Sequence, residues 1–307
     1  MLTLALAVVL GASLQARYDA AREVVESSRD ARTLAAARRE IAAVEHADGA
    51  PRVRRYRAPA LPATWARAHP EARRDARLSA RLEAIASRFP GTSAVWVHDL
   101  RNGRTASWNA ELAIPAGSTV KLAAFAAALH VRRRDLRYDV AQVAGWSSNL
   151  AANRIVELLG YARVYAALRA LGMTHSTYPG PYRAGTAVGA AHARVTTAHD
   201  LGRALFALQR AALGRSSFLA RAQGQRALAL LRHSVPYGVN YGLLRPWLGR
   251  TAVAEKNGWL SDLRVTAAIV YRRRGPVIVV VALARDEVNG AVARELGRRV
   301  WRAVQAR

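Results

Sequence analysis

The chain has 307 residues, of which 51% are hydrophobic, so it can bury a sizeable core and is not globally disordered. It has no cysteine, which excludes a disulfide scaffold, a zinc–cysteine site and a cysteine nucleophile. The formal net charge of +26 favours anionic surroundings such as a nucleic acid, a membrane surface or an anionic wall polymer. Because no nucleic-acid-binding motif accompanies this charge, we expect no nucleic-acid partner, and an arginine-rich solvated surface is the simpler explanation.

Residues 2–14 form an apolar run that is shorter than the roughly 20 residues a membrane-spanning helix needs. We interpret residues 1–16 as a signal peptide or membrane anchor, so we expect an extracytoplasmic protein, secreted or anchored; an ordinary N-terminal helix is the alternative. Residues 17–46 have a helical composition and residues 49–75 are rich in Pro and Arg. The segment 17–77 therefore predicts a helical stalk and a basic linker.

The compact domain is expected at 78–307. It begins with a helix at 78–88, followed by strands at 93–100 and 104–109 around a turn. Further helices are predicted at 116–130, 148–159, 162–171, 197–212, 221–231 and 290–304, and strands at 251–258, 264–272 and 276–284. This order predicts an α/β (α+β) fold, in which both chain ends build a five-stranded antiparallel sheet flanked by helices, with an all-helical subdomain inserted.

Lysine is rare in this chain. Of the 47 Lys and Arg residues, only Lys121 and Lys256 are lysines. Arginine does not release its proton at working pH, whereas a buried lysine can. The two lysines are therefore candidates for positions that require an amine.

The first candidate motif runs from Ser118 to Lys121 and lies at the start of a predicted helix. Positions i and i+3 share a helix face, and the free N–H groups of a first turn favour developing negative charge. Lys121 would then accept the proton of Ser118, if burial and cationic neighbours lower its pKa. A bare S-x-x-K also occurs by chance, so this spacing alone makes Ser118 a candidate nucleophile and no more.

The second candidate motif is Ser147-Ser148-Asn149, directly before another predicted helix. A hydroxyl and an amide two residues apart suit a loop that passes a proton and holds a substrate amide. The same residue types are preferred at helix N-caps, and on these residues alone that structural interpretation is the favoured one.

The third candidate motif is Lys256-Asn257-Gly258, on a predicted strand and followed by Trp259. The lysine ammonium would hold a substrate carboxylate, and Gly258 would let a substrate approach the strand edge. The N–H of Trp259 would complete an oxyanion hole with the N–H of Ser118. An exposed lysine at a turn is the alternative.

In this order the three motifs resemble the S-x-x-K, S-x-N and K-x-G set of class A β-lactamases and penicillin-binding proteins. The surrounding sequence resembles that family over about 78–305, notably SAVWVHDLRNGRTASWNAELAIPAGSTVKL, WSSNLAANRIVELLG and EKNGWLSDLRVTAAIVYRRRGPVIVVVAL. The resemblance implies a serine hydrolase in which Ser118 is acylated and Lys121 activates it. Ser147 would pass a proton to the leaving nitrogen, and Asn149 would bind the substrate amide.

The same resemblance implies that Lys256, Asn257 and Gly258 shape the carboxylate side of the pocket. Arg264 would help to bind the substrate carboxylate, with a solvated strand arginine as the alternative. The implied substrate is a small β-lactam or a peptidoglycan-like peptide. We expect no cofactor, no metal and a monomer.

The sequence departs from the family where hydrolytic members carry a deacylating glutamate, between the second and third motifs. The corresponding region, about 172–196, contains no carboxylate. Three carboxylates lie elsewhere between these motifs: Glu157, Asp200 and Glu255. Each has a structural interpretation, so we expect impaired deacylation, and we consider His175 and Tyr178 weak substitutes for the base. In addition, Ser148 stands where the family has Asp, and Asn257 where it has Thr or Ser.

Three functions follow from these observations. The leading hypothesis is a serine hydrolase that forms an acyl-enzyme with β-lactams or related amides. A D-Ala-D-Ala peptidase acting on the cell wall is the enzymatic alternative. A non-catalytic exported scaffold that holds wall polymer is the third.

Overall fold

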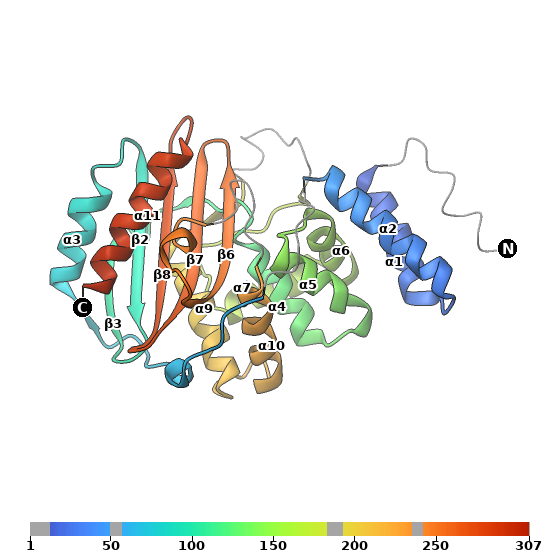
Figure 1. Ribbon diagram of the computed structural model, residues 1–307, viewed down its shortest axis with the longest axis horizontal. Coiled ribbons are helices and arrows are strands. Elements are labelled where there is room, and N and C mark those ends of the chain that lie inside the picture. Colours follow the sequence, from blue (N-terminus) through green and yellow to red (C-terminus); the bar gives the residue numbers. More distant parts are fainter. Residues whose placement is uncertain (1–12, 50–56, 183–192, 235–241, 307) are drawn as a thin grey trace.

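The computed structural model describes residues 13–49, 57–182, 193–234 and 242–306. Its main sheet has the order β1-β3-β2-β8-β7-β6 (Figure 1). The strands are β1 (Arg73–Arg74), β2 (Thr92–Asp99), β3 (Arg104–Trp108), β6 (Ala252–Leu260), β7 (Leu263–Arg272) and β8 (Gly275–Ala284). All pairs from β3 to β6 are antiparallel, so strands from the two ends of the domain share one sheet, as predicted.

The sheet has six strands rather than the five expected. The additional strand, β1, pairs in parallel with β3 over only two residues, at Arg73 with Arg104 and at Arg74 with Thr105. A two-residue strand carries no hydrophobic alternation that a sequence pattern can detect. It forms because the chain before α3 (Ala76–Ala86) runs along the exposed edge of β3 and uses its free backbone groups.

Helices cover both faces of the sheet (Figure 1). One face packs against α3 and α11 (Gly290–Gln305), and the other against α9 (Ala198–Ala212). Side chains of β2 alternate between two cores, with Trp96 on the α9 side and Val97 on the other. Gly202 lets α9 approach the sheet, because a Cβ there would lie 2.1 Å from the Trp96 ring.

The helical subdomain is inserted between β3 and β6 (Figure 1). Its helices are α4 (Lys121–Val131), α5 (Arg137–Gly145), α6 (Asn149–Leu159), α7 (Tyr161–Ala170) and α10 (Arg221–Arg232). Two short strands, β4 (Ile114–Pro115) and β5 (Val195–Thr196), pair nearby, and the described residues include 3-10 turns at Ala63–Ala66, Arg134–Leu136 and Arg245–Trp247. The first nine residues of α4 are buried, so this helix is the centre of the subdomain. It begins at Lys121, later than predicted, and α5 was not predicted.

The N-terminal helices form a hairpin of α1 (Leu14–Ser27) and α2 (Ala31–Ala47), seated beside α6 (Figure 1). Tyr18 Oη donates to the buried Asp139 Oδ1 at 2.6 Å, and Arg22 donates to Asp139 Oδ2 at 3.3 Å. Ile41 and Val44 are fully buried in the same core as the helical subdomain. The segment expected to be a stalk is thus packed on the domain, because this apolar face would otherwise lie in water.

The predicted signal peptide or anchor at residues 1–16 falls largely outside the described residues. Within the parts that are described, no helix has both the length and the apolar character needed to cross a membrane.

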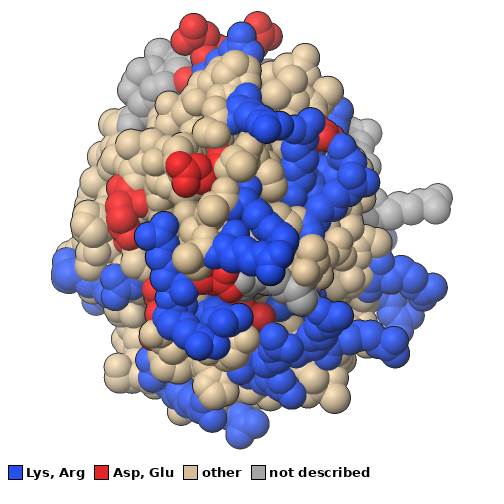
Figure 2. All heavy atoms as spheres, turned by 90° about the vertical axis from the view of Figure 1, so that its left-hand side faces the viewer, with Lys and Arg blue, Asp and Glu red and all other residues tan. Residues whose placement is uncertain are grey.

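Exposed arginines are spread over the face that carries α3 and α11 (Figure 2). They include Arg77, Arg81, Arg299 and Arg302. Few acidic side chains lie between them in this view. A diffuse arginine surface of this kind accounts for the basic composition without a defined binding motif.

Candidate active site

Ser118 lies in the turn that leads into α4, where Lys121 N–H donates to Ser118 O at 3.3 Å. Ser118 is partly exposed, whereas the next two residues, Thr119 and Val120, are buried. Thr119 Oγ1 donates to Ala116 O at 2.6 Å and fixes the turn. The nucleophile candidate is therefore presented to solvent at the head of a buried helix.

The turn of Ser118 packs directly against the backbone of β6, and glycine on both sides makes this contact feasible. Gly117 has a φ of +51°, and a Cβ there would lie 3.1 Å from Trp259 N. A Cβ on Gly258 would lie 2.8 Å from Ala116 O and 3.0 Å from Ser118 N. The backbone N–H groups of Ser118 and Trp259 thus come from two facing segments, the arrangement that an oxyanion hole needs.

Lys121 is fully buried and points at the second motif. Its Nζ donates to Ser147 O and to Asn149 Oδ1, both at 2.6 Å. Burial first, and then the charge of Lys256, hold the pKa of Lys121 well below its usual value. A lysine with a lowered pKa can be neutral near neutral pH and can accept a proton.

Ser147 connects the two lysines. Its φ of +61° lies in the left-handed region, which a residue with a Cβ seldom adopts. In this conformation its carbonyl accepts from Lys121 while its Oγ accepts from Lys256 Nζ at 2.6 Å. The next residue, Ser148, caps helix α6, because its Oγ accepts a hydrogen bond from Ala151 N at 3.0 Å. Ser148 is thus the helix cap, whereas Ser147 binds the two lysines.

Lys256 is 2% exposed on β6, and burial lowers its pKa to about 7. Asn257 faces the opposite side of the sheet, where its Oδ1 accepts from Thr266 Oγ1 at 2.9 Å. The structure does not bring the Asn257 side chain together with the lysines.

The last two predicted residues lie at the end of the β6–β7 hairpin. The Trp259 side chain is 42% exposed, so its contribution to the site is its backbone N–H. Arg264 folds back on this turn and donates to the carbonyls of Leu260 and Leu263. The Arg264 guanidinium is therefore engaged by acceptors at the end of the hairpin.

The substitutes considered for the deacylating base have other roles. His175 is exposed, and Asp200 accepts from its backbone N–H and from Ser176 Oγ, each at 2.8 Å, which anchors the loop. Tyr178 is fully buried and contacts the Tyr182 ring edge-on, with centroids 5.6 Å apart. Glu255 pairs with Arg245 at 2.6 Å on the far side of β6.

Three residues of the site escaped the sequence analysis. Tyr182 places its ring 4.3 Å from Lys121 Nζ and donates through Oη to Gly117 O at 3.2 Å. Glu45 and Asp48, at the end of α2, both act electrostatically on Lys121. The only sequence signal was that these two acids lie three residues apart, beside the apolar positions of a helix.

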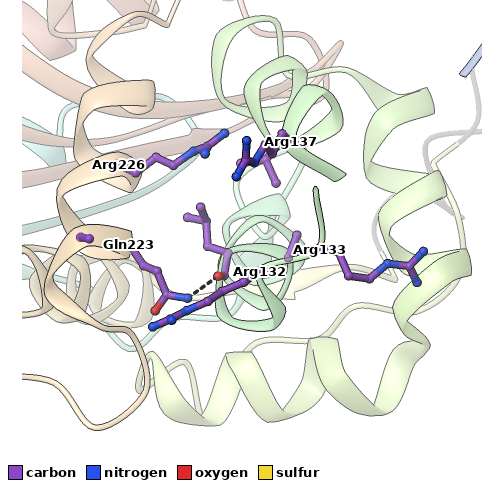
Figure 3. A pocket seen from close by; sticks show the side chains of 9 residues that line it. Arg132, Arg133, Arg137, Gln223 and Arg226 are labelled. Atoms are coloured by element: carbon purple, nitrogen blue, oxygen red, sulfur yellow. Dashed lines mark hydrogen bonds between the residues drawn. The ribbon is translucent and has the colours of Figure 1, made fainter. Parts of the chain in front are cut away.

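A separate pocket of about 320 Å³ lies between α4, α5 and α10 (Figure 3). Arg132, Arg137 and Arg226 line it, and Gln223 Nε2 donates to Leu129 O at 2.6 Å. It is at the C-terminal end of α4, about 15 Å along the helix from Ser118. This pocket is therefore distinct from the lysine site.

The sequence and the fold were compared with known proteins. A sequence model described as the β-lactamase enzyme family matches residues 77–139 and 130–304. A search of curated proteins finds no match.

Among solved structures, PBP-A matches with 18% identity over 81% of this chain and 100% of its own, at a TM-score of 0.63. A β-lactamase from Desulfarculus baarsii matches with 21% identity over 76% of this chain and 98% of its own, at 0.63. An ancestral class A β-lactamase matches with 22% identity over 74% and 99%, at 0.59. At these identities the likeness concerns the fold.

Proposed function

Since this chain belongs to the β-lactamase enzyme family, we propose that it is a serine hydrolase that forms an acyl-enzyme at Ser118 with β-lactams or related amides. The observation that carries this proposal is the convergence of two buried amines on one residue. Lys121 and Lys256 bind the carbonyl and the hydroxyl of Ser147, respectively. Two buried ammonium groups this close repel each other, so a purely structural explanation is unfavourable.

Acylation follows from this arrangement. Neutral Lys121 takes the proton of Ser118 Oγ, and Oγ forms a bond to the substrate carbonyl carbon. The N–H groups of Ser118 and Trp259 stabilise the negative charge on the carbonyl oxygen. The bond to the leaving nitrogen then breaks, and that nitrogen receives a proton through Ser147 Oγ, which Lys256 Nζ contacts at 2.6 Å.

The substrate is oriented by the remaining polar groups. Lys256 binds its carboxylate as a point charge, and the Asn149 amide binds its side-chain amide. One solved relative with the same fold, an L158E mutant of PBP-A, is described as an acyl-enzyme complex with penicillin G. This supports a β-lactam as the probe of choice. Because residues 172–196 contain no carboxylate, we propose that the acyl-enzyme hydrolyses slowly.

The test is labelling of the full chain by a fluorescent penicillin, followed by intact mass spectrometry. We expect one adduct per chain with the mass of the whole penicillin, and none with Ser118→Ala. Lys121→Arg keeps a long basic side chain, but arginine stays protonated and cannot accept a proton, so this variant should slow labelling by roughly 10²- to 10⁴-fold. Absence of an adduct, or an adduct that persists in Ser118→Ala, would refute the proposal and favour a non-catalytic scaffold.

A peptidase acting on D-Ala-D-Ala peptides is the second candidate, favoured by the likeness to PBP-A and by the missing loop carboxylate. A chromogenic cephalosporin distinguishes the two. Many turnovers per enzyme indicate a β-lactamase, whereas a single burst with release of D-Ala from a peptide indicates a peptidase.

We propose an extracytoplasmic location and a monomeric state for this enzyme. The apolar run at 2–14 supports export, and the arginine-rich surface supports contact with an anionic wall polymer or membrane surface. Fractionation of cells and sedimentation of the purified chain measure these two properties.

A further inference from the structure

The end of helix α2 reaches the second motif from outside the segment that the family shares. Glu45 Oε1 accepts from Ser148 Oγ at 2.7 Å, across 103 positions of sequence. One helical turn later, Asp48 faces the side-chain amide of Asn149. The family match begins at residue 77, so both acids come from the N-terminal hairpin.

Glu45 is buried to an extent that needs an explanation. It is 7% exposed, and within the described parts of the chain its Oε2 has no hydrogen-bond partner. An unpaired carboxylate oxygen in such a place is unfavourable unless a nearby positive charge offsets it. Lys121 is that charge, and its attraction opposes the effect of burial on the pKa of Glu45.

Asp48 follows the last residue of α2, and its carboxylate acts on Lys121. Burial raises the pKa of Asp48 and Lys121 lowers it, and Asp48 in turn raises the pKa of Glu45, which also interacts with Asp139. Asn149 contacts both partners, because its Oδ1 accepts from Lys121 Nζ while its amide stabilises the Asp48 carboxylate. Asp48 is only partly buried, so water can reach its carboxylate.

We propose that Asp48 is the general base that activates the water for hydrolysis of the acyl-enzyme. This inference rests on the proposed acylation of Ser118. It assigns to the N-terminal hairpin the role for which residues 172–196 offer no carboxylate. Burial raises the pKa of Asp48, which makes its carboxylate a stronger base than an exposed aspartate.

The deacylation step balances with residues of this chain alone. Asp48 takes one proton from the water, and the water oxygen forms a bond to the acyl carbon. The bond between that carbon and Ser118 Oγ breaks. The proton on Asp48 passes through Lys121 to Ser118 Oγ, which restores the free enzyme and releases the acid.

The other carboxylates near the motifs do not compete for this role. Asp200 anchors the loop of His175, and Glu255 is paired with Arg245 on the opposite face of the sheet. Glu157 is exposed on the outer side of α6. Among the described acids that perturb Lys121, Asp48 has the largest effect.

The experiment measures acylation and deacylation separately in the full chain, with a fluorescent penicillin as the probe. Labelling rates report acylation, and the decay of the labelled protein after removal of free probe reports deacylation. The test variant is Asp48→Asn. Glu23→Gln is the matched control, because it removes one carboxylate from an exposed position of the same hairpin.

We expect labelled Asp48→Asn to lose its label at least 10²-fold more slowly than labelled wild type, a ratio that is measured after labelling is complete and so does not depend on the labelling rate. Asp48→Glu should recover part of the decay rate, a rescue that a structural role does not predict. Glu23→Gln should behave as wild type. If Asp48→Asn loses stability, the comparison of Asp48→Glu with wild type still decides.

Equal decay rates in wild type and Asp48→Asn would overturn the proposal, and so would a wild-type adduct that never decays. Failure of wild type to label at all would instead refute the acyl-enzyme function itself. The two failures are therefore distinct: one concerns the appearance of the label and the other its loss.

Discussion

Ser147 offers a test in which stability and activity should move in opposite directions. Its backbone has a φ of +61°, and its side chain and carbonyl join the two lysines. Ser147→Gly and Ser147→Ala both remove the hydroxyl that contacts Lys256. Only Ser147→Ala keeps a Cβ and therefore the backbone strain. Comparing the two variants separates the effect of backbone strain on stability from the effect of the lost hydroxyl on acylation.

The magnitude follows from the backbone conformation. A residue with a Cβ in the left-handed region is disfavoured by about 1–2 kcal/mol. Glycine offsets part of this gain, because it loses about 0.5–1 kcal/mol more than alanine through chain entropy. Ser147→Gly should therefore exceed Ser147→Ala in stability by roughly 1 kcal/mol, or about 2–4 °C in melting temperature.

The assays are thermal unfolding and labelling by a fluorescent penicillin. Both variants should label roughly 10²-fold or more slowly than wild type, since proton delivery to the leaving nitrogen is lost. Equal melting temperatures for the two variants would show that residue 147 is not left-handed. A glycine variant that labels at the wild-type rate would show that the hydroxyl between the lysines has no part in acylation.

Two further predictions concern the contacts between the N-terminal hairpin and the rest of the domain. Burial raises the pKa of Glu45 from 4.5 to about 7. Between these pH values the folded protein keeps Glu45 protonated, whereas the unfolded chain releases that proton. The free energy of unfolding of wild type should therefore fall as pH rises from 4.5 to about 7, by up to roughly 3 kcal/mol. Glu45→Gln should remove that slope in urea unfolding measured from pH 4.5 to 7.5, and parallel curves would contradict this. Arg22→Met leaves the fully buried Asp139 paired with Arg154 but not with Arg22. We expect it to lower the free energy of unfolding by about 3 kcal/mol. A decrease below about 1 kcal/mol would show that the contact between Arg22 and Asp139 is weak.

The sheet was the most predictable part of the fold. The runs in β2, β7 and β8 are long and apolar because both faces of the sheet are covered, and their predicted bounds differ by one residue from those observed. Helix α5 was missed because it is nine residues long and polar, and its buried Asp139 depends on Tyr18 and Arg22, which lie more than 100 positions away. Local patterns carry no information on such contacts.

Within the site, the sequence indicated which residues to expect but not where each side chain points. In the structure Lys121 binds Ser147 and Asn149, and Lys256 binds Ser147. The resemblance assigned Arg264 to the substrate carboxylate, with a solvated strand arginine as the alternative, and in the structure its guanidinium donates to the carbonyls of Leu260 and Leu263. Whether a strand side chain enters a site depends on register and on local acceptors, which spacing does not determine.

The charges of the site explain why the hairpin belongs to it. Two buried lysines on one serine are unfavourable unless negative charge lies nearby, and the described carboxylates that act on Lys121 come from α2. The domain that the family shares supplies both amines but neither of these acids. A hairpin seated through Asp139 therefore moderates the repulsion between the lysines and, in the same place, supplies a base. The same contact that fixes the N-terminal helices should thus control how fast the acyl-enzyme is released.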